Sequence, residues 1–226
     1  MSYMWNEFNI KTFPAETIVF RDGKYCPDLS TLENKPINKK YNLPVHIIYV
    51  GEIAGNNELN IELNTDNQNL FISVFIKNKL PAFFNIFIKN TGENSNIRGH
   101  IMLQNQDMLN YKCKCEYLSK NTGILLKNKL LAGKDSVSEL SGTAIIKKDC
   151  ENCDSDISFC AMVEKNAKVT FIPAQRVSSE PVNAEHSASI YKPNDFQIQY
   201  LRESGLGILE IQNTMKEAFI NDFSLF

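Results

Sequence analysis

The chain has 226 residues, of which 43% are hydrophobic, and its formal net charge is -2. This hydrophobic content can fill a core, which argues against wholesale disorder. A net charge so close to zero argues against a nucleic-acid-binding protein, which would present a basic stripe to phosphates. No apolar run reaches the roughly 18–20 residues of a membrane-spanning helix. The N-terminus lacks the basic region and apolar core of a secretion signal, so we expect a soluble, cytoplasmic chain.

Residues 1–43 differ in pattern from the rest of the chain and are predicted to form an N-terminal segment and linker. Within them, residues 17–25 show the pattern of a strand, an Asp-Gly turn at Asp22 and Gly23, and the start of a second strand. The polar stretch over residues 33–40 then indicates an exposed linker.

Residues 44–192 are predicted to form a body of short strands. Apolar or alternating runs are separated by stretches rich in Asn, Asp, Gly and Lys, and no helical pattern lies between them. The runs are residues 45–50, 59–63, 70–76, 83–88, 97–103, 111–115, 142–146, 157–163 and 167–172. This succession fits either a sandwich of antiparallel sheets or a β-helix in which each turn stacks on the last. We find no strict short repeat that would decide between them.

The last segment, residues 193–226, changes to a helical period and is predicted to form a short helical hairpin. Asn194 or Asp195 can cap the first helix, and Gly205 can adopt the left-handed conformation that ends it. A second helix is expected from about Ile208 to Ile220, with one apolar stripe formed by Ile208, Ile211, Met215, Ala218 and Phe219. The stripe indicates packing on the chain's own core or docking of a partner.

The cysteines offer one pair with the spacing of a metal clamp, Cys150 and Cys153. A structural zinc site usually needs a second such pair, which the sequence lacks, so the alternative is two loop cysteines without a ligand. Cys113 and Cys115 share one side of a predicted strand and are expected in the core. The chain has no G-x-x-x-x-G-K-[ST] phosphate loop, so we expect no ATP site in it.

The junction between the strands and the hairpin resembles a known family. Val182, Ala184, His186, Ala188, Ser189 and Ile190 fall on the positions of a V-x-[CA]-x-H-[GS]-A-[ST]-[VI] segment. That segment is similar to the end of the β-helix in the SufB/SufD family of iron–sulfur cluster assembly scaffolds. Residues 197–206 resemble the family's next helix and turn, and Ile211, Met215 and Phe219 match the apolar positions of its final helix. Residues 18–25, followed by Leu29 and Ser30, resemble the SufD-type N-terminal element.

The resemblance implies a mainly β protein, a right-handed parallel β-helix with a short C-terminal helical hairpin. It also implies a SufD-like, non-ATPase scaffold subunit without enzymatic activity of its own. Such a subunit would pair with a SufB-like chain or with a second copy, and would dock the ABC-type ATPase SufC. The docking residues expected from the resemblance are Tyr200, Leu201, Arg202, Met215 and Phe219.

The resemblance further implies a transient iron–sulfur cluster at a subunit interface, with His186 and neighbouring Glu185 as candidate ligands. His186 is therefore one candidate metal ligand, and the pair Cys150 and Cys153, singled out by its spacing, is another. The chain departs from the family pattern, because Ala184 replaces a frequent cysteine, Ser204 replaces an arginine, and the whole chain is shorter than typical members.

Three alternatives follow from these departures and from the β-rich pattern. The first alternative is a degenerate family member that only supports assembly. The second is an unrelated β-sandwich that binds carbohydrate or peptide. An enzyme on a β-solenoid, such as a sugar lyase, is the third alternative. It would need clustered carboxylates and basic residues along one flank, and the sequence does not show them.

Overall fold

The computed structural model describes residues 16–33 and 40–221. The predicted linker lies largely on residues 34–39, outside the described residues. The strands are β1 (Glu16–Arg21), β2 (Lys24–Tyr25), β3 (Val45–Glu52), β4 (Gly55–Leu63), β5 (Asn69–Asn78), β6 (Ala82–Asn90), β7 (Asn96–Asn105), β8 (Met108–Tyr117), β9 (Gly123–Ala132), β10 (Val137–Ile146), β11 (Cys153–Val163), β12 (Lys168–Val177) and β13 (Val182–Tyr191). The helices are the 3-10 turn η1 (Pro27–Leu29), α2 (Asp195–Glu203) and α3 (Ile208–Asn221).

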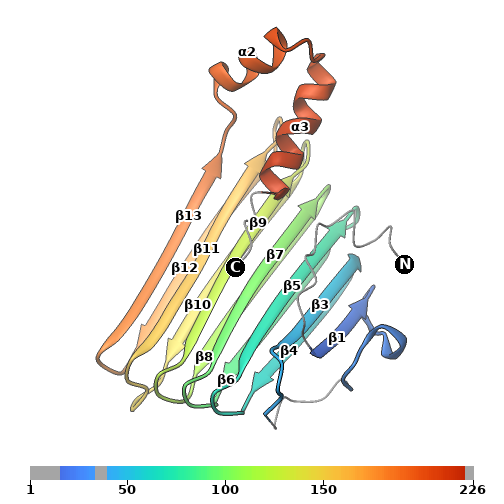
Figure 1. Ribbon diagram of the computed structural model, residues 1–226. Coiled ribbons are helices and arrows are strands. Elements are labelled where there is room, and N and C mark those ends of the chain that lie inside the picture. The colour runs from blue at the N-terminus through green and yellow to red at the C-terminus, as the bar shows by residue number, and fades with distance from the viewer. Residues whose placement is uncertain (1–15, 34–39, 222–226) are drawn as a thin grey trace.

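From β3 onward, consecutive strands alternate between two sheets (Figure 1). One sheet has the order β13-β11-β9-β7-β5-β3-β1-β2, and the other has the order β12-β10-β8-β6-β4. The strands from β3 to β13 pair in parallel within each sheet. The chain is therefore a parallel β-solenoid of about six turns. This confirms the β-helix prediction and excludes the antiparallel sandwich.

The N-terminal strands extend the first sheet. β1 pairs in parallel with β3 and turns back into β2 through Asp22 and Gly23, whose φ angles are +50° and +77°. Glycine adopts this left-handed conformation without the steric cost that a side chain would bring. Residues 16–21 thus belong to the same sheet as the solenoid strands.

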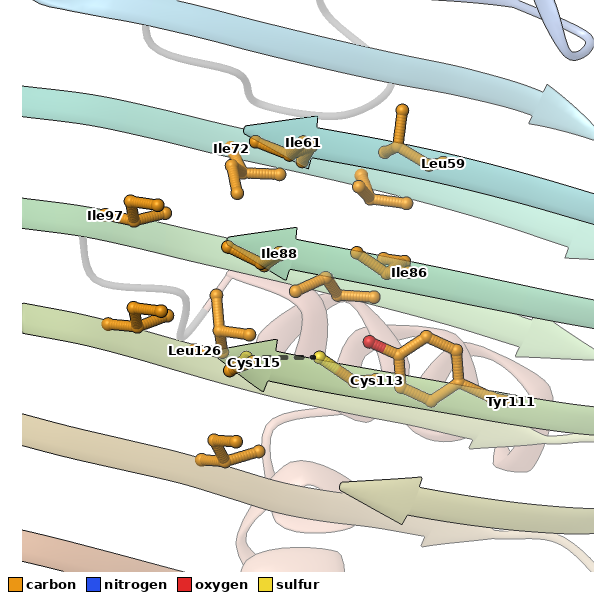
Figure 2. Packing of buried hydrophobic residues seen from close by; sticks show 14 of the residues in the cluster. Leu59, Ile61, Ile72, Ile86, Ile88, Ile97, Tyr111, Cys113, Cys115 and Leu126 are labelled. Atoms are coloured by element: carbon orange, nitrogen blue, oxygen red, sulfur yellow. Dashed lines mark hydrogen bonds between the residues drawn. The ribbon is translucent and has the colours of Figure 1, made fainter. Parts of the chain in front are cut away.

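The core fills the space between the sheets because alternate side chains of every strand point inward. Aromatic rings from both sheets cross it in a row, with centroid distances of 5.9 Å from Phe20 to Tyr49, 5.5 Å from Tyr49 to Phe84 and 6.0 Å from Phe84 to Tyr111. Cys113 and Cys115 lie beside Tyr111 in this core, as predicted, and their sulfur atoms are 3.8 Å apart (Figure 2).

One corner of the solenoid is held by buried polar side chains that stack from turn to turn. The amide of Asn78 donates to the side-chain oxygen of Asn105 at 2.8 Å, and the amide of Asn105 donates to the hydroxyl of Ser138 at 2.7 Å. The Asn105 amide also lies 2.9 Å from the carbonyl oxygen of Val137. These bonds satisfy the amide N–H groups of side chains that are almost completely buried, so the corners of successive turns are tied to one another. The side-chain oxygen of Asn78, at the start of the ladder, is buried without a partner in the described residues.

The C-terminal helices begin and end close to where the sequence predicts. Asn194 caps α2 in a capping box, because its side chain accepts from the backbone N–H of Gln197 while the Gln197 side chain accepts from the backbone of Asn194. Gly205 has a φ of +88° and follows the end of this helix. No helix among the described residues is long and apolar enough to cross a membrane.

Replacing Asn105 with alanine should leave the Asn78 and Ser138 side chains without their buried partner. We expect the free energy of unfolding, measured by urea denaturation, to fall by about 1–3 kcal/mol. Asn96→Ala is the matched control, because Asn96 is the exposed first residue of the same strand. Equal losses for the two variants would contradict the role given to the corner ladder.

Candidate functional site

The last turn of the solenoid, formed by β12 and β13, is open. In the described residues β12 pairs only with β10, and β13 only with β11, so each has one unpaired edge of backbone N–H and C=O groups. Val177 and Ile190, which are in register with buried residues of the previous turn, are 42% and 59% exposed. Two sheet edges and an apolar surface therefore meet at this end of the molecule.

His186 lies in the middle of this open turn. It shares the inward face of β13 with Val182 and Ala184, which pack against the core. Its Nε2 atom is buried and has no hydrogen-bond partner in the described structure. Burial lowers the pKa of His186, and the carboxylate of Asp156 opposes that effect. The imidazole is therefore mainly neutral at pH 7, which is the form that binds metals.

Glu185 points to the opposite face of the strand, because neighbouring residues on a strand alternate. It is exposed and pairs in register with Asp156 of β11. The pKa of Asp156 is raised, first by its burial and then by the negative charge of Glu185. The two ligands predicted side by side in the sequence therefore do not face one another.

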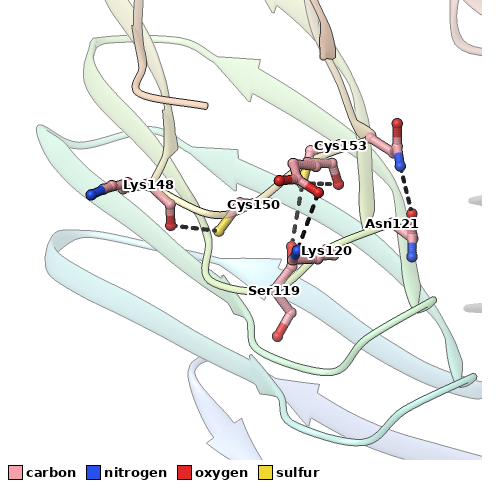
Figure 3. Close-up of polar contacts among 8 residues, drawn as sticks. Ser119, Lys120, Asn121, Lys148, Cys150 and Cys153 are labelled. Carbon is pink, nitrogen blue, oxygen red and sulfur yellow. Dashed lines mark hydrogen bonds and ion pairs between the residues drawn. The ribbon is translucent and has the colours of Figure 1, made fainter. Parts of the chain in front are cut away.

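Cys150 and Cys153 lie on either side of a turn, and both of their side chains are buried (Figure 3). The Cys150 sulfur lies 3.4 Å from the carbonyl oxygen of Tyr117, and the Cys153 sulfur lies 3.3 Å from that of Ser119. The pKa of the Cys150 thiol is raised by burial and by Cys153. Both cysteines therefore contact the chain's own backbone, and the described residues contain no group of three or more His, Cys, Asp or Glu that could hold a metal ion.

The structure also keeps these cysteines apart from His186. Cys153 is in register with Val182, and His186 lies four residues further along β13. At about 3.3 Å per residue, the separation along the strand is roughly 13 Å. A shared metal site formed by these three side chains is not assembled in this structure.

The other two histidines, His46 and His100, lie on the outer face of the larger sheet. The Nε2 atom of His46 lies 2.9 Å from the hydroxyl of Ser73. Burial lowers the pKa of His46 to about 4 and that of His100 to about 4, with Lys127 and Lys129 adding to the effect on His100. Both are neutral at pH 7.

The helical hairpin packs on the outer face of the larger sheet. Ile211, Met215 and Phe219 are buried against side chains of β5, β7, β9 and β11, namely Phe75, Met102, Leu131 and Met162. Lys129 lies beneath α3, where its ammonium donates to the carbonyl oxygen of Phe219 at 2.7 Å and lies 4.9 Å from the centroid of the Phe219 ring. The end of α3 is thereby fixed to the sheet.

The predicted docking residues divide into two groups. Tyr200 and Arg202 are exposed, whereas Met215 and Phe219 are buried by the chain itself and Leu201 is half-buried in the same cluster. The structure adds Phe196, which is 83% exposed, one helical turn before the 70%-exposed Tyr200. We call Phe196 and Tyr200 the hairpin surface. Their spacing of four residues on a helix is the signal by which the sequence could have indicated it.

These features define the class of protein as an open parallel β-solenoid with a helical hairpin after its last strand. A family model described as "SUF system FeS cluster assembly, SufBD core domain" matches residues 61–219. The chain therefore belongs to the SufBD core domain family, which links it to iron–sulfur cluster assembly. A search of curated proteins gave no match.

Replacing Lys129 with methionine should loosen α3, because it removes the charged donor that holds the Phe219 carbonyl oxygen but keeps an unbranched apolar side chain. A hydrogen bond to a charged group contributes about 1.5–3 kcal/mol. We therefore expect amide hydrogen exchange in residues 208–221 to accelerate about tenfold or more. Lys127→Met is the control, because Lys127 is exposed on the same strand face. Unchanged exchange in Lys129→Met would show that apolar packing alone holds the helix.

Proposed function

We propose that the chain is a SufD-like, non-ATPase scaffold subunit of a cytoplasmic iron–sulfur cluster assembly complex. The observation that carries this proposal is the open last turn in a member of the SufBD core family. Unpaired edges and an exposed Ile190 favour a partner whose strands continue the sheets. The partner that we propose is a SufB-like chain or a second copy of this chain.

His186 would then lie at the boundary between the two scaffold chains. Its neutral, unpartnered Nε2 atom supports a role as one ligand to a nascent cluster, which is the cargo of the complex. Clusters are held mainly by thiolates, so the partner chain would supply the cysteines. Glu185 could contribute only from the opposite face of β13, and Cys150 and Cys153 only after their turn had opened.

The hairpin surface would dock the SufC-like ATPase, with Arg202 beside it. Aromatic residues and arginine are the side chains most often responsible for binding energy in protein interfaces. Because Met215 and Phe219 fix α3 to the sheet, movement of the docked ATPase would be transmitted to the solenoid. ATP-driven closure of two ATPase protomers would shift one scaffold chain against the other and expose the ligands.

The docking role is tested by co-purification with the ATPase from the same cells. The double variant Phe196→Ser, Tyr200→Ser should reduce retention of the ATPase by about tenfold or more, because truncating a central aromatic costs about 2 kcal/mol or more. Phe83→Ser is the control, since Phe83 is 42% exposed on the other sheet. If the wild-type chain retains neither the ATPase nor a SufB-like partner, the proposed function is wrong.

The ligand role is tested by anaerobic reconstitution of the purified complex with iron and sulfide. His186→Ala should lower the cluster absorbance, whereas Glu185→Ala should leave it close to the wild-type value because that side chain faces away. Size-exclusion chromatography checks that both complexes assemble. Equal loading of all three complexes would favour the alternative, a family member that supports assembly without binding the cluster.

A further inference from the structure

A pocket of about 530 Å³ lies between the helical hairpin and the body of the solenoid. It is bounded by the corner that follows β9, by the end of β11 and its following corner, and by residues of α2 and α3. Its volume falls within the roughly 300–1,000 Å³ of small-molecule sites. Neither the hairpin surface nor His186 lines it.

The interior of this pocket is apolar and adaptable. Met162 and Met215 contribute flexible thioether side chains, while Ile198, Ile208 and Ile211 contribute branched ones. Methionine fits irregular shapes because its side chain is unbranched and polarizable. Ile208 lines the pocket and is 65% exposed, so its side chain is accessible to an entering molecule.

The rim of the pocket is cationic. Lys134, Lys165, Arg202 and Lys216 line it together with a single carboxylate, Glu164. Both oxygens of that carboxylate are already engaged, one by the ammonium of Lys216 and the other by the backbone N–H of Lys134 at 3.1 Å. No ion pair to Lys165 or Arg202 is formed within the described ranges 16–33 and 40–221. The ammonium of Lys134 lies 3.7 Å from the carboxylate of Asp135. The rim therefore carries two cations, Lys165 and Arg202, that form no ion pair with any described residue.

We propose that this pocket binds an amphipathic monoanion, an apolar chain ending in a carboxylate. The chain would occupy the space lined by the two methionines and three isoleucines. The carboxylate would lie at the rim, where Arg202 can donate two parallel hydrogen bonds and Lys165 adds a second positive charge. A neutral molecule would leave these cations unpaired, and a cationic one would be repelled by them.

Decanoate and decyltrimethylammonium are suitable probes, because they share a ten-carbon chain and carry opposite charges. Isothermal titration calorimetry of the full chain, with both probes below their micellar concentrations, should show binding of decanoate and at least about tenfold weaker binding of the cation. Absence of decanoate binding, or equal affinity for the two probes, would overturn the proposal.

Two matched pairs of variants place the binding in this pocket. Ile208→Asp should raise the Kd for decanoate about tenfold, while Leu209→Asp should change it less than twofold, because Leu209 is 70% exposed in the same helix but does not line the pocket. The double variant Lys165→Gln, Arg202→Gln should weaken binding about fivefold, and the control Lys168→Gln, Arg176→Gln should not. Circular dichroism checks that each variant is folded.

An unchanged Kd in the Ile208→Asp variant would show that decanoate binds elsewhere, for example at the open last turn, and the proposal would be wrong. The Ile208→Asp and Leu209→Asp variants keep Phe196, Tyr200, Arg202 and His186. Loss of decanoate binding in Ile208→Asp is therefore separable from loss of ATPase docking or of cluster loading.

Discussion

Stacking in register governs how the parts of this solenoid fit together. Each strand bonds to the same strand of the next turn, so a residue at a corner meets its counterpart one turn away. A buried amide N–H group at such a corner is satisfied when the next turn offers an acceptor, as Asn105 does for Asn78 and Ser138 does for Asn105. Because the turns superimpose in this way, the outer face of the larger sheet is continuous enough for α3 to pack on it. The same register places His186 in the last row.

Much of the architecture follows from local patterns in the sequence, and the parts that do not have physical reasons. The alternation of apolar and polar residues predicted most of the strands, and the capping residue Asn194 predicted the start of α2. The sequence did not predict β9, because its leucines are not β-branched and do not favour a strand by themselves. Pairing with β7 and β11 determines the conformation of this segment. The signal for a solenoid was also present. Asn67, Asn94 and Asn121 recur with the 27-residue separation that joins Asn69 to Asn96, and all three have positive φ.

The candidate sites were harder to predict, because a sequence gives the order of side chains but not what covers them. Successive side chains of a strand point to opposite faces, so His186 and Glu185 lie on opposite faces of β13. A strand prediction for residues 182–190 would have been enough to infer this. The burial of Met215 and Phe219 depends on residues of four strands far away in the chain, so an apolar stripe cannot reveal whether it faces its own sheet or a partner. The pocket beside the hairpin is likewise formed by the corners of two adjacent turns together with residues of the two helices.

The open last turn also bears on how well the chain resists proteolysis in the cell. In a solenoid each repeat is stabilised chiefly by its nearest neighbours, and β12 has a neighbour on one side only. Fraying therefore costs less in β12 than in the interior strands of the same sheet, and a chain without a partner exposes β12 to proteases before β10, β8 and β6. If the proposed scaffold partner pairs with this edge, it would close that entry point. The amount of this protein would then follow the supply of that partner.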